Sequence, residues 1–119
     1  MDNWTRAGLA KAVQDGGPGL RFQLPVPGQD KPERAFIVRF EGQVFGYLNR
    51  CGHVPVELDW PEGQFFDDVS AVIVCASHGA SYHPGTGACL GGPCDGRGLV
   101  RLEVRLLGEE VWARWPSDD

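Results

Sequence analysis

The sequence lacks any long run of apolar residues. The longest, Ala71-Val72-Ile73-Val74-Cys75-Ala76, is six residues long, whereas a helix needs about 20 apolar residues to cross a bilayer. The first residues do not combine a basic stretch with an apolar core, so we expect no secretory signal peptide. These features predict a soluble, cytoplasmic protein with no membrane association.

Positive charge is also scarce. The chain of 119 residues has 11 Lys and Arg against 16 Asp and Glu, which gives a formal net charge of −5. Binding to nucleic-acid phosphates needs an excess of basic residues on one face. The charge balance therefore argues against a nucleic-acid partner.

Only 4 cysteines are present, while Gly and Pro are abundant at 17 and 9 residues. Thiols stay reduced in the cytosol, so four cysteines there favour metal or redox chemistry over structural disulfides. Because Gly and Pro both interrupt helices, their abundance disfavours a helical bundle. The length fits one domain, and we expect it to be a loop-rich β protein.

Apolar and polar residues alternate with a period of two along several segments, which is typical of half-buried strands. The Glu41-Gly42 pair lies between two of them and predicts a hairpin turn. We expect strands over residues 20–24, 36–40, 44–48, 70–74, 100–106 and 110–115.

The expected single domain spans residues 1–119, and its first 19 residues are the least regular. Leu9, Ala12 and Val13 would share one face of a helix, so the sequence predicts a short helix over 4–13. Two loop-rich segments, about 49–69 and 75–97, hold all the cysteines and histidines. This distribution predicts a β scaffold that presents its chemistry on loops.

Each of these loop segments carries a Cys and a His directly after an expected strand. The first has Cys51-Gly52-His53 and the second has Cys75-Ala76-Ser77-His78, with 21 residues between the two arms. One such residue alone is more often a small buried side chain or a surface loop residue. Four of them in two matched arms indicate a shared metal site.

The composition of the arms narrows the choice of metal. A structural zinc site usually takes two like ligands from each arm. Arms with one thiolate and one imidazole each suit a centre of two metal atoms, in which one atom receives both Cys and the other receives both His. This is the ligand arrangement of a Rieske [2Fe–2S] centre.

The sequence resembles the Rieske family over about residues 20–115. Asn49-Arg50-Cys51-Gly52-His53, followed by Leu58, is similar to the first Rieske box, and Cys75-Ala76-Ser77-His78-Gly79-Ala80-Ser81-Tyr82 is similar to the second. Gly87-Ala88-Cys89-Leu90-Gly91-Gly92-Pro93 resembles the third loop, whose Gly-Pro segment covers the cluster in this family. Leu99 resembles the residue that opens the returning strand.

The resemblance implies an all-β, Rieske-type fold: an antiparallel β-sandwich or barrel base with a small, loop-rich cluster-binding subdomain. It also implies one [2Fe–2S] cluster per chain, with Cys51 and Cys75 on one iron and His53 and His78 on the other. The residues expected around these ligands are Val54, Gly79, Ala80, Tyr82, Gly92 and Pro93.

The chain departs from the Rieske proteins of membrane complexes in two places. Those proteins join their two ligand loops by a disulfide, whose positions correspond here to Val56 and Ser77. They also have a Ser that donates a hydrogen bond to a bridging sulfide, and the corresponding residue here is Ala80. Their Tyr donor to a ligand thiolate corresponds to Tyr82, for which a packing role is equally open. Since hydrogen bonds to sulfur raise the potential, we expect a value in the lower or middle part of the Rieske range of roughly −150 to +300 mV.

A few reactive or aromatic residues lie outside this set. Cys89 and Cys94 are inert small residues, a short-loop disulfide or redox-responsive thiols, and a reducing cytosol favours the first. His83 is expected to be a solvent-exposed loop residue. Trp60 and Phe65-Phe66 either pack under the long loop, which we favour, or form an apolar docking rim.

The sequence therefore predicts a ferredoxin-like one-electron carrier whose partners are redox proteins, namely a reductase and an oxygenase or other redox enzyme. The chain is too short for the mononuclear-iron domain of an oxygenase, so we expect no catalysis by the chain alone and no small-molecule substrate. Two alternatives remain: a non-catalytic small subunit of a reductase complex, and a zinc or redox-sensor site.

Overall fold

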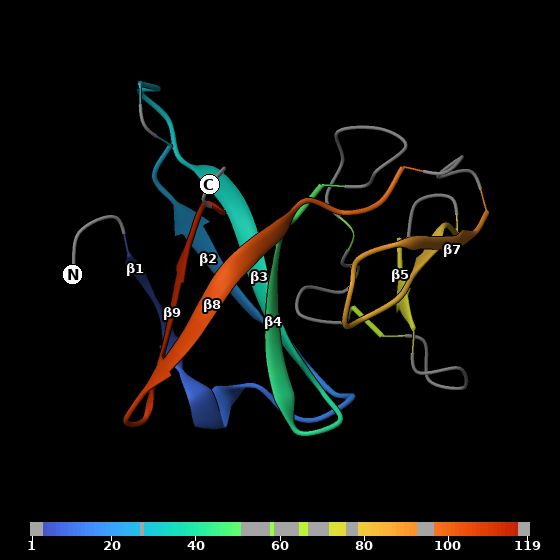
Figure 1. Cartoon of the computed structure of the whole chain (residues 1–119), viewed down its shortest axis with the longest axis horizontal. Helices are drawn as coiled ribbons and strands as arrows, with labels where there is room; N and C mark the ends of the chain where they lie inside the picture. Colours follow the sequence, from blue (N-terminus) through green and yellow to red (C-terminus); the bar gives the residue numbers. More distant parts are fainter. Residues whose placement is uncertain are drawn as a thin grey trace.

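The computed structural model describes residues 4–26, 28–50, 58, 65–66, 72–75, 79–92 and 97–116. Its larger part is a six-stranded antiparallel sheet in the order β1-β9-β8-β4-β3-β2, which curls into a nearly closed barrel (Figure 1). Its strands are β1 (Thr5–Leu9), β2 (Leu20–Leu24), β3 (Glu33–Phe40), β4 (Gln43–Leu48), β8 (Arg101–Leu107) and β9 (Glu110–Arg114).

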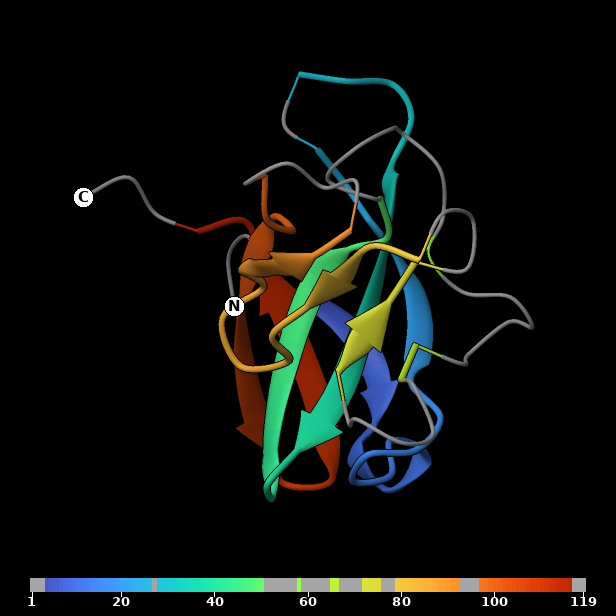
Figure 2. The same ribbon diagram turned by 90° about the vertical axis from the view of Figure 1, so that its right-hand side faces the viewer.

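A second, smaller sheet stands beside the barrel. It has the order β5-β6-β7 and consists of β5 (Ile73–Val74), β6 (Ser81–Tyr82) and β7 (Cys89–Gly91). Figure 2 shows these short strands in front of β3 and β4, so the small sheet covers the outer face of that hairpin. In the part of the chain that the structure describes, no helix is long and apolar enough to span a membrane.

The barrel interior is filled by alternate residues of its strands. Ile37, Leu102 and Ala113 are buried there, as the two-residue period of the sequence requires. At Gly46 a Cβ atom would lie 2.7 Å from Cγ2 of Val104. Glycine at this position therefore lets β4 and β8 approach closely.

A separate core lies between the barrel and the small sheet. Phe36 of β3 stacks on Phe65 with ring centroids 3.9 Å apart and ring planes at 12°. The buried members of this core, which we call the shared core, are Phe36, Val38, Tyr47, Leu58, Phe65, Ile73, Cys75, Ala80, Tyr82 and Leu99. The small sheet thus packs its apolar side chains on the barrel.

Several strand predictions are confirmed. β3 and β4 form the expected hairpin, with Val38 opposite Phe45. Glu41 and Gly42 make its turn at φ 51° and 80°, the left-handed conformation that such tight turns require. The strands expected at 20–24 and 110–115 correspond to β2 and β9.

One helix prediction is wrong, and two strand predictions hold with shifted or partly described bounds. Residues 4–13 do not form the expected helix: β1 occupies Thr5–Leu9 and pairs with β9, and only Ala10–Ala12 are helical, as a short 3₁₀ helix (η1). The backbone hydrogen bonds supplied by β9 outweigh the weak local helical pattern. The strand expected at 100–106 runs from 101 to 107, and Val100 and Leu106 are 43% and 47% exposed. Of the strand expected at 70–74, the structure assigns Ile73–Val74, and Ser70 and Ala71 lie outside the described residues.

Candidate metal centre

The second Cys-His arm begins where β5 ends. β5 and β6 pair as a short hairpin, with Ile73 opposite Tyr82. Cys75 follows β5 directly, and its backbone N–H donates to the carbonyl of Ala80 at 2.8 Å, while the N–H of Gly79 donates to the carbonyl of Cys75 at 2.9 Å. These two bonds close the loop and fix the backbone of Cys75.

The side chain of Cys75 is fully buried and forms no disulfide. It packs in the shared core with Ala80 and Tyr82. A thiolate in such apolar surroundings is costly unless a positive charge compensates it. A buried thiol that forms no disulfide, at the end of a strand and on a loop held by backbone bonds, fits a thiolate ligand of a metal centre.

The third loop lies directly against this second loop. A Cβ atom at Gly92 would be 2.9 Å from Cα of Ala80 and 3.0 Å from the carbonyl oxygen of Gly79. Gly92 also has φ +82°, a left-handed conformation that glycine adopts at little cost. The two backbones touch here because position 92 has no side chain.

The first loop is closed at its base by Asn49, which is 5% exposed. Its backbone N–H donates to the carbonyl of Arg34 at 2.8 Å, and its Oδ1 accepts from the N–H of Leu58 at 2.9 Å. The side chain therefore ties the end of β4 to Leu58 of the shared core. The sequence placed Asn49 in the first box without a role; a buried Asn immediately after an apolar strand is the signal that could have indicated one.

Tyr47 joins the barrel to the segment between β6 and β7. Its hydroxyl donates to the carbonyl of Pro84 at 2.5 Å, and burial raises its pKa to about 12, with the charge of Arg101 acting in the opposite direction. A Cβ atom at Gly87 would lie 2.8 Å from Cε1 of the same ring. The sequence marked Tyr47 only as a strand residue, because its partners are far away in the chain.

The structure brings together five of the residues expected at the site: Cys75, Gly79, Ala80, Tyr82 and Gly92. The other five, Cys51, His53, Val54, His78 and Pro93, lie outside the described residues. Within the described ranges no three His, Cys, Asp or Glu side chains form a group that could hold a metal ion. Cys75 is the one expected ligand in those ranges.

The remaining predictions have mixed outcomes. Cys89 is disulfide-bonded, so the expectation of an inert thiol is wrong for this residue, and Cys94 lies outside the described residues. Phe65 is 1% exposed and belongs to the shared core, which confirms packing rather than an exposed rim for this residue. His83 is exposed as expected, and its Nδ1 accepts from the N–H of Gly85.

The fold is similar to that of solved ferredoxin structures. The ferredoxin of carbazole 1,9a-dioxygenase from Nocardioides aromaticivorans IC177 superposes with a TM-score of 0.72 at 23% identity, over 97% of this chain and 100% of that one. A complex of reduced oxygenase and oxidized ferredoxin in carbazole 1,9a-dioxygenase gives 0.71 at 21% identity, over 96% and 94% of the two chains. At such identities the likeness shows the fold, and it confirms the expected all-β, Rieske-type architecture.

A comparison of the sequence with known families identifies the family of this chain. No curated protein matches the chain. Residues 3–107 match the Rieske [2Fe-2S] domain, a domain that binds a two-iron cluster through two Cys and two His. With nearly its whole length matched, the chain belongs to the Rieske [2Fe–2S] domain family.

Proposed function

We propose that the protein is a one-electron carrier that passes electrons from a reductase to an oxygenase. The observation that carries this proposal is the buried, disulfide-free Cys75 on a hairpin loop in a chain of the Rieske family. The similar solved structures support the choice of partner, because they include complexes of a ferredoxin with an oxygenase. In this proposed function the protein binds no small-molecule substrate.

The proposed ligands are Cys51 and Cys75 for one iron and His53 and His78 for the other. When bound, the [2Fe–2S] cluster supplies a centre that accepts and releases a single electron. On the protein side, the shared core excludes water from the Cys75 sulfur, and Ala80 offers no hydroxyl to the cluster. This supports a reduction potential in the lower or middle part of the Rieske range, roughly −150 to +300 mV.

We further propose that the carrier works in the cytoplasm. The short apolar runs support this location. Cell fractionation with an antibody to the protein tests it, and recovery in a membrane or secreted fraction would contradict it.

The proposal is tested by the absorption spectrum of anaerobically purified protein and by its EPR spectrum after dithionite reduction. We expect a brown protein with two irons per chain and the low average g value of a His-ligated cluster. Cys75→Ser should lose this signal, whereas Cys89→Ser, which breaks a disulfide outside the proposed ligand set, should retain it. A protein that stays colourless and holds zinc after iron reconstitution would contradict the electron-carrier function and favour the zinc-site alternative.

A further inference from the structure

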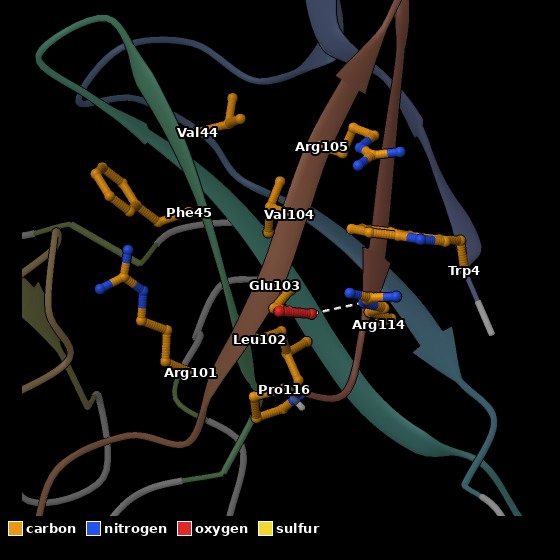
Figure 3. A pocket seen from close by; sticks show the side chains of 10 residues that line it. All are labelled: Trp4, Val44, Phe45, Arg101, Leu102, Glu103, Val104, Arg105, Arg114 and Pro116. Carbon is orange, nitrogen blue, oxygen red and sulfur yellow. Dashed lines mark hydrogen bonds and ion pairs between the residues drawn. The ribbon is translucent and has the colours of Figure 1, made fainter. Parts of the chain in front are cut away.

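A groove of about 490 Å³ opens on the barrel, and none of the proposed ligands lines it. β4 and β8 pair at Gly46↔Leu102 and Tyr47↔Arg101, and the two strands diverge beyond these pairs (Figure 1). The groove follows this divergence, with Phe45 on one side and Trp4 on the other (Figure 3). Val44, Leu102 and Val104 give it an apolar lining.

Positive charge gathers along this groove. Arg101, Arg105 and Arg114 line it together with one carboxylate, that of Glu103, which pairs with Arg114 at 2.5 Å. These are three of the 11 basic residues of a chain whose net charge is −5. The groove is therefore a locally cationic surface on an anionic protein, and it attracts groups of negative charge.

Aromatic rings hold the arginines in place. Figure 3 shows the indole of Trp4 edge-on between two guanidinium groups, with Arg105 4.9 Å and Arg114 4.5 Å from the ring centroid. On the opposite side Arg101 lies 5.6 Å from the ring centroid of Phe45. Stacking uses the face of a guanidinium, while its N–H groups point outward in the plane, the geometry that binds carboxylates. Such ordering lowers the entropy lost when a ligand binds.

The groove adjoins the cluster-binding part of the molecule. Phe45 packs against the shared core, and Arg101 lies beside Tyr47, whose hydroxyl binds the carbonyl of Pro84. Phe45 therefore belongs both to the lining of the groove and to the edge of the shared core under the small sheet. This continuity favours a segment of a partner protein over a separate small molecule.

We propose that this groove is a docking site for a segment of the redox partner in which carboxylates flank an apolar side chain. The apolar side chain lies on Val44 and Val104, and the carboxylates accept hydrogen bonds from Arg101 and Arg105. That the partner is a redox protein rests on the proposed function; the binding itself does not require electron transfer.

The test uses the oxidised, ¹⁵N-labelled holoprotein and the synthetic peptide acetyl-DEFED-amide, with acetyl-NQFQN-amide as its uncharged control. We expect the acidic peptide to shift the amide signals of residues 44–45 and 101–105, with an affinity that falls as salt is added. Arg101→Ser and Arg105→Ser should each weaken binding about tenfold or more. Arg6→Ser, which removes the same charge from a pair with Glu110 outside the groove, should leave binding unchanged.

Four outcomes would overturn the proposal. If the acidic peptide shifts no amide signal up to its solubility limit, or shifts only signals on another face, the groove is not its binding site. Equal weakening by Arg6→Ser would show a response to net charge alone, and equal binding of phenylacetate would show a small-carboxylate site in place of a docking surface. The EPR spectrum of the same sample reports the cluster independently, so failure of docking and failure of the carrier function are distinguishable.

Discussion

The contact between the second and third loops yields a sharp prediction for Gly92→Ala. The new methyl group would lie 2.9 Å from Cα and 3.2 Å from N of Ala80, and 3.0 Å from the carbonyl oxygen of Gly79. All three atoms belong to the backbone, so no side chain can rotate away. The loops must separate, or the methyl group must be strained.

The magnitude follows from two separate costs. An alanine at φ +82° costs about 1–2 kcal/mol as a left-handed residue, and overpacking against a fixed backbone adds about 1–3 kcal/mol. Gly28 is a matched control, since it has φ +81° with nothing within 4 Å of its Cβ position. Both variants change the unfolded chain equally, so Gly92→Ala should be less stable than Gly28→Ala by about 1–3 kcal/mol.

Urea unfolding measures this difference when it is followed by far-UV circular dichroism and, separately, by the visible absorption of the cluster. Two probes are needed because proteins with bound cofactors often unfold in more than two states. We expect Gly92→Ala to lose its visible absorption at lower urea than Gly28→Ala. Equal midpoints for the two variants would refute the close contact between the loops.

Two further predictions concern the hydrogen bonds that anchor the site. Asn49→Ala leaves the buried N–H of Leu58 without its acceptor and should cost about 1–3 kcal/mol, whereas Asn49→Asp keeps an acceptor oxygen; equal urea midpoints for wild type and Asn49→Ala would contradict this role. Tyr47 has a pKa of about 12 in the folded protein against 10.0 for the free side chain. The stability that its protonated hydroxyl contributes to the folded protein is therefore complete below pH 10 and is lost as pH rises to 12. Relative to Tyr47→Phe, the wild type should lose up to about 3 kcal/mol over this window, and parallel stability curves for the two proteins would show that Tyr47 titrates normally.

Local sequence patterns were sufficient where a strand and its partner are close in the chain. The β3–β4 hairpin is an example, because the alternation of 36–40 and the Glu41-Gly42 turn determine it together. β1 shows the opposite case, since its partner β9 is about a hundred residues away. Nothing in residues 4–13 indicates that distant pairing, and the same residues carry a weak helical period.

The site was predictable as a set of residues but not as a set of contacts. The Cys-His spacing identified Cys75 and its loop without any structure. The bond from Leu58 to Asn49 and the approach of Gly92 to Ala80 join segments that no short motif contains. β6 and β7 were missed for a different reason: strands of two and three residues are too short to show an alternating period.

The shared core has a consequence for biogenesis. β5, β6 and β7 are only two or three residues long, and their apolar side chains pack on Phe36 and Tyr47 of the β3–β4 hairpin. The small sheet therefore has no surface on which to assemble until that hairpin exists. The loop that carries Cys75 can accordingly be held in place only once the hairpin has formed, so we expect cluster assembly to follow folding of the barrel.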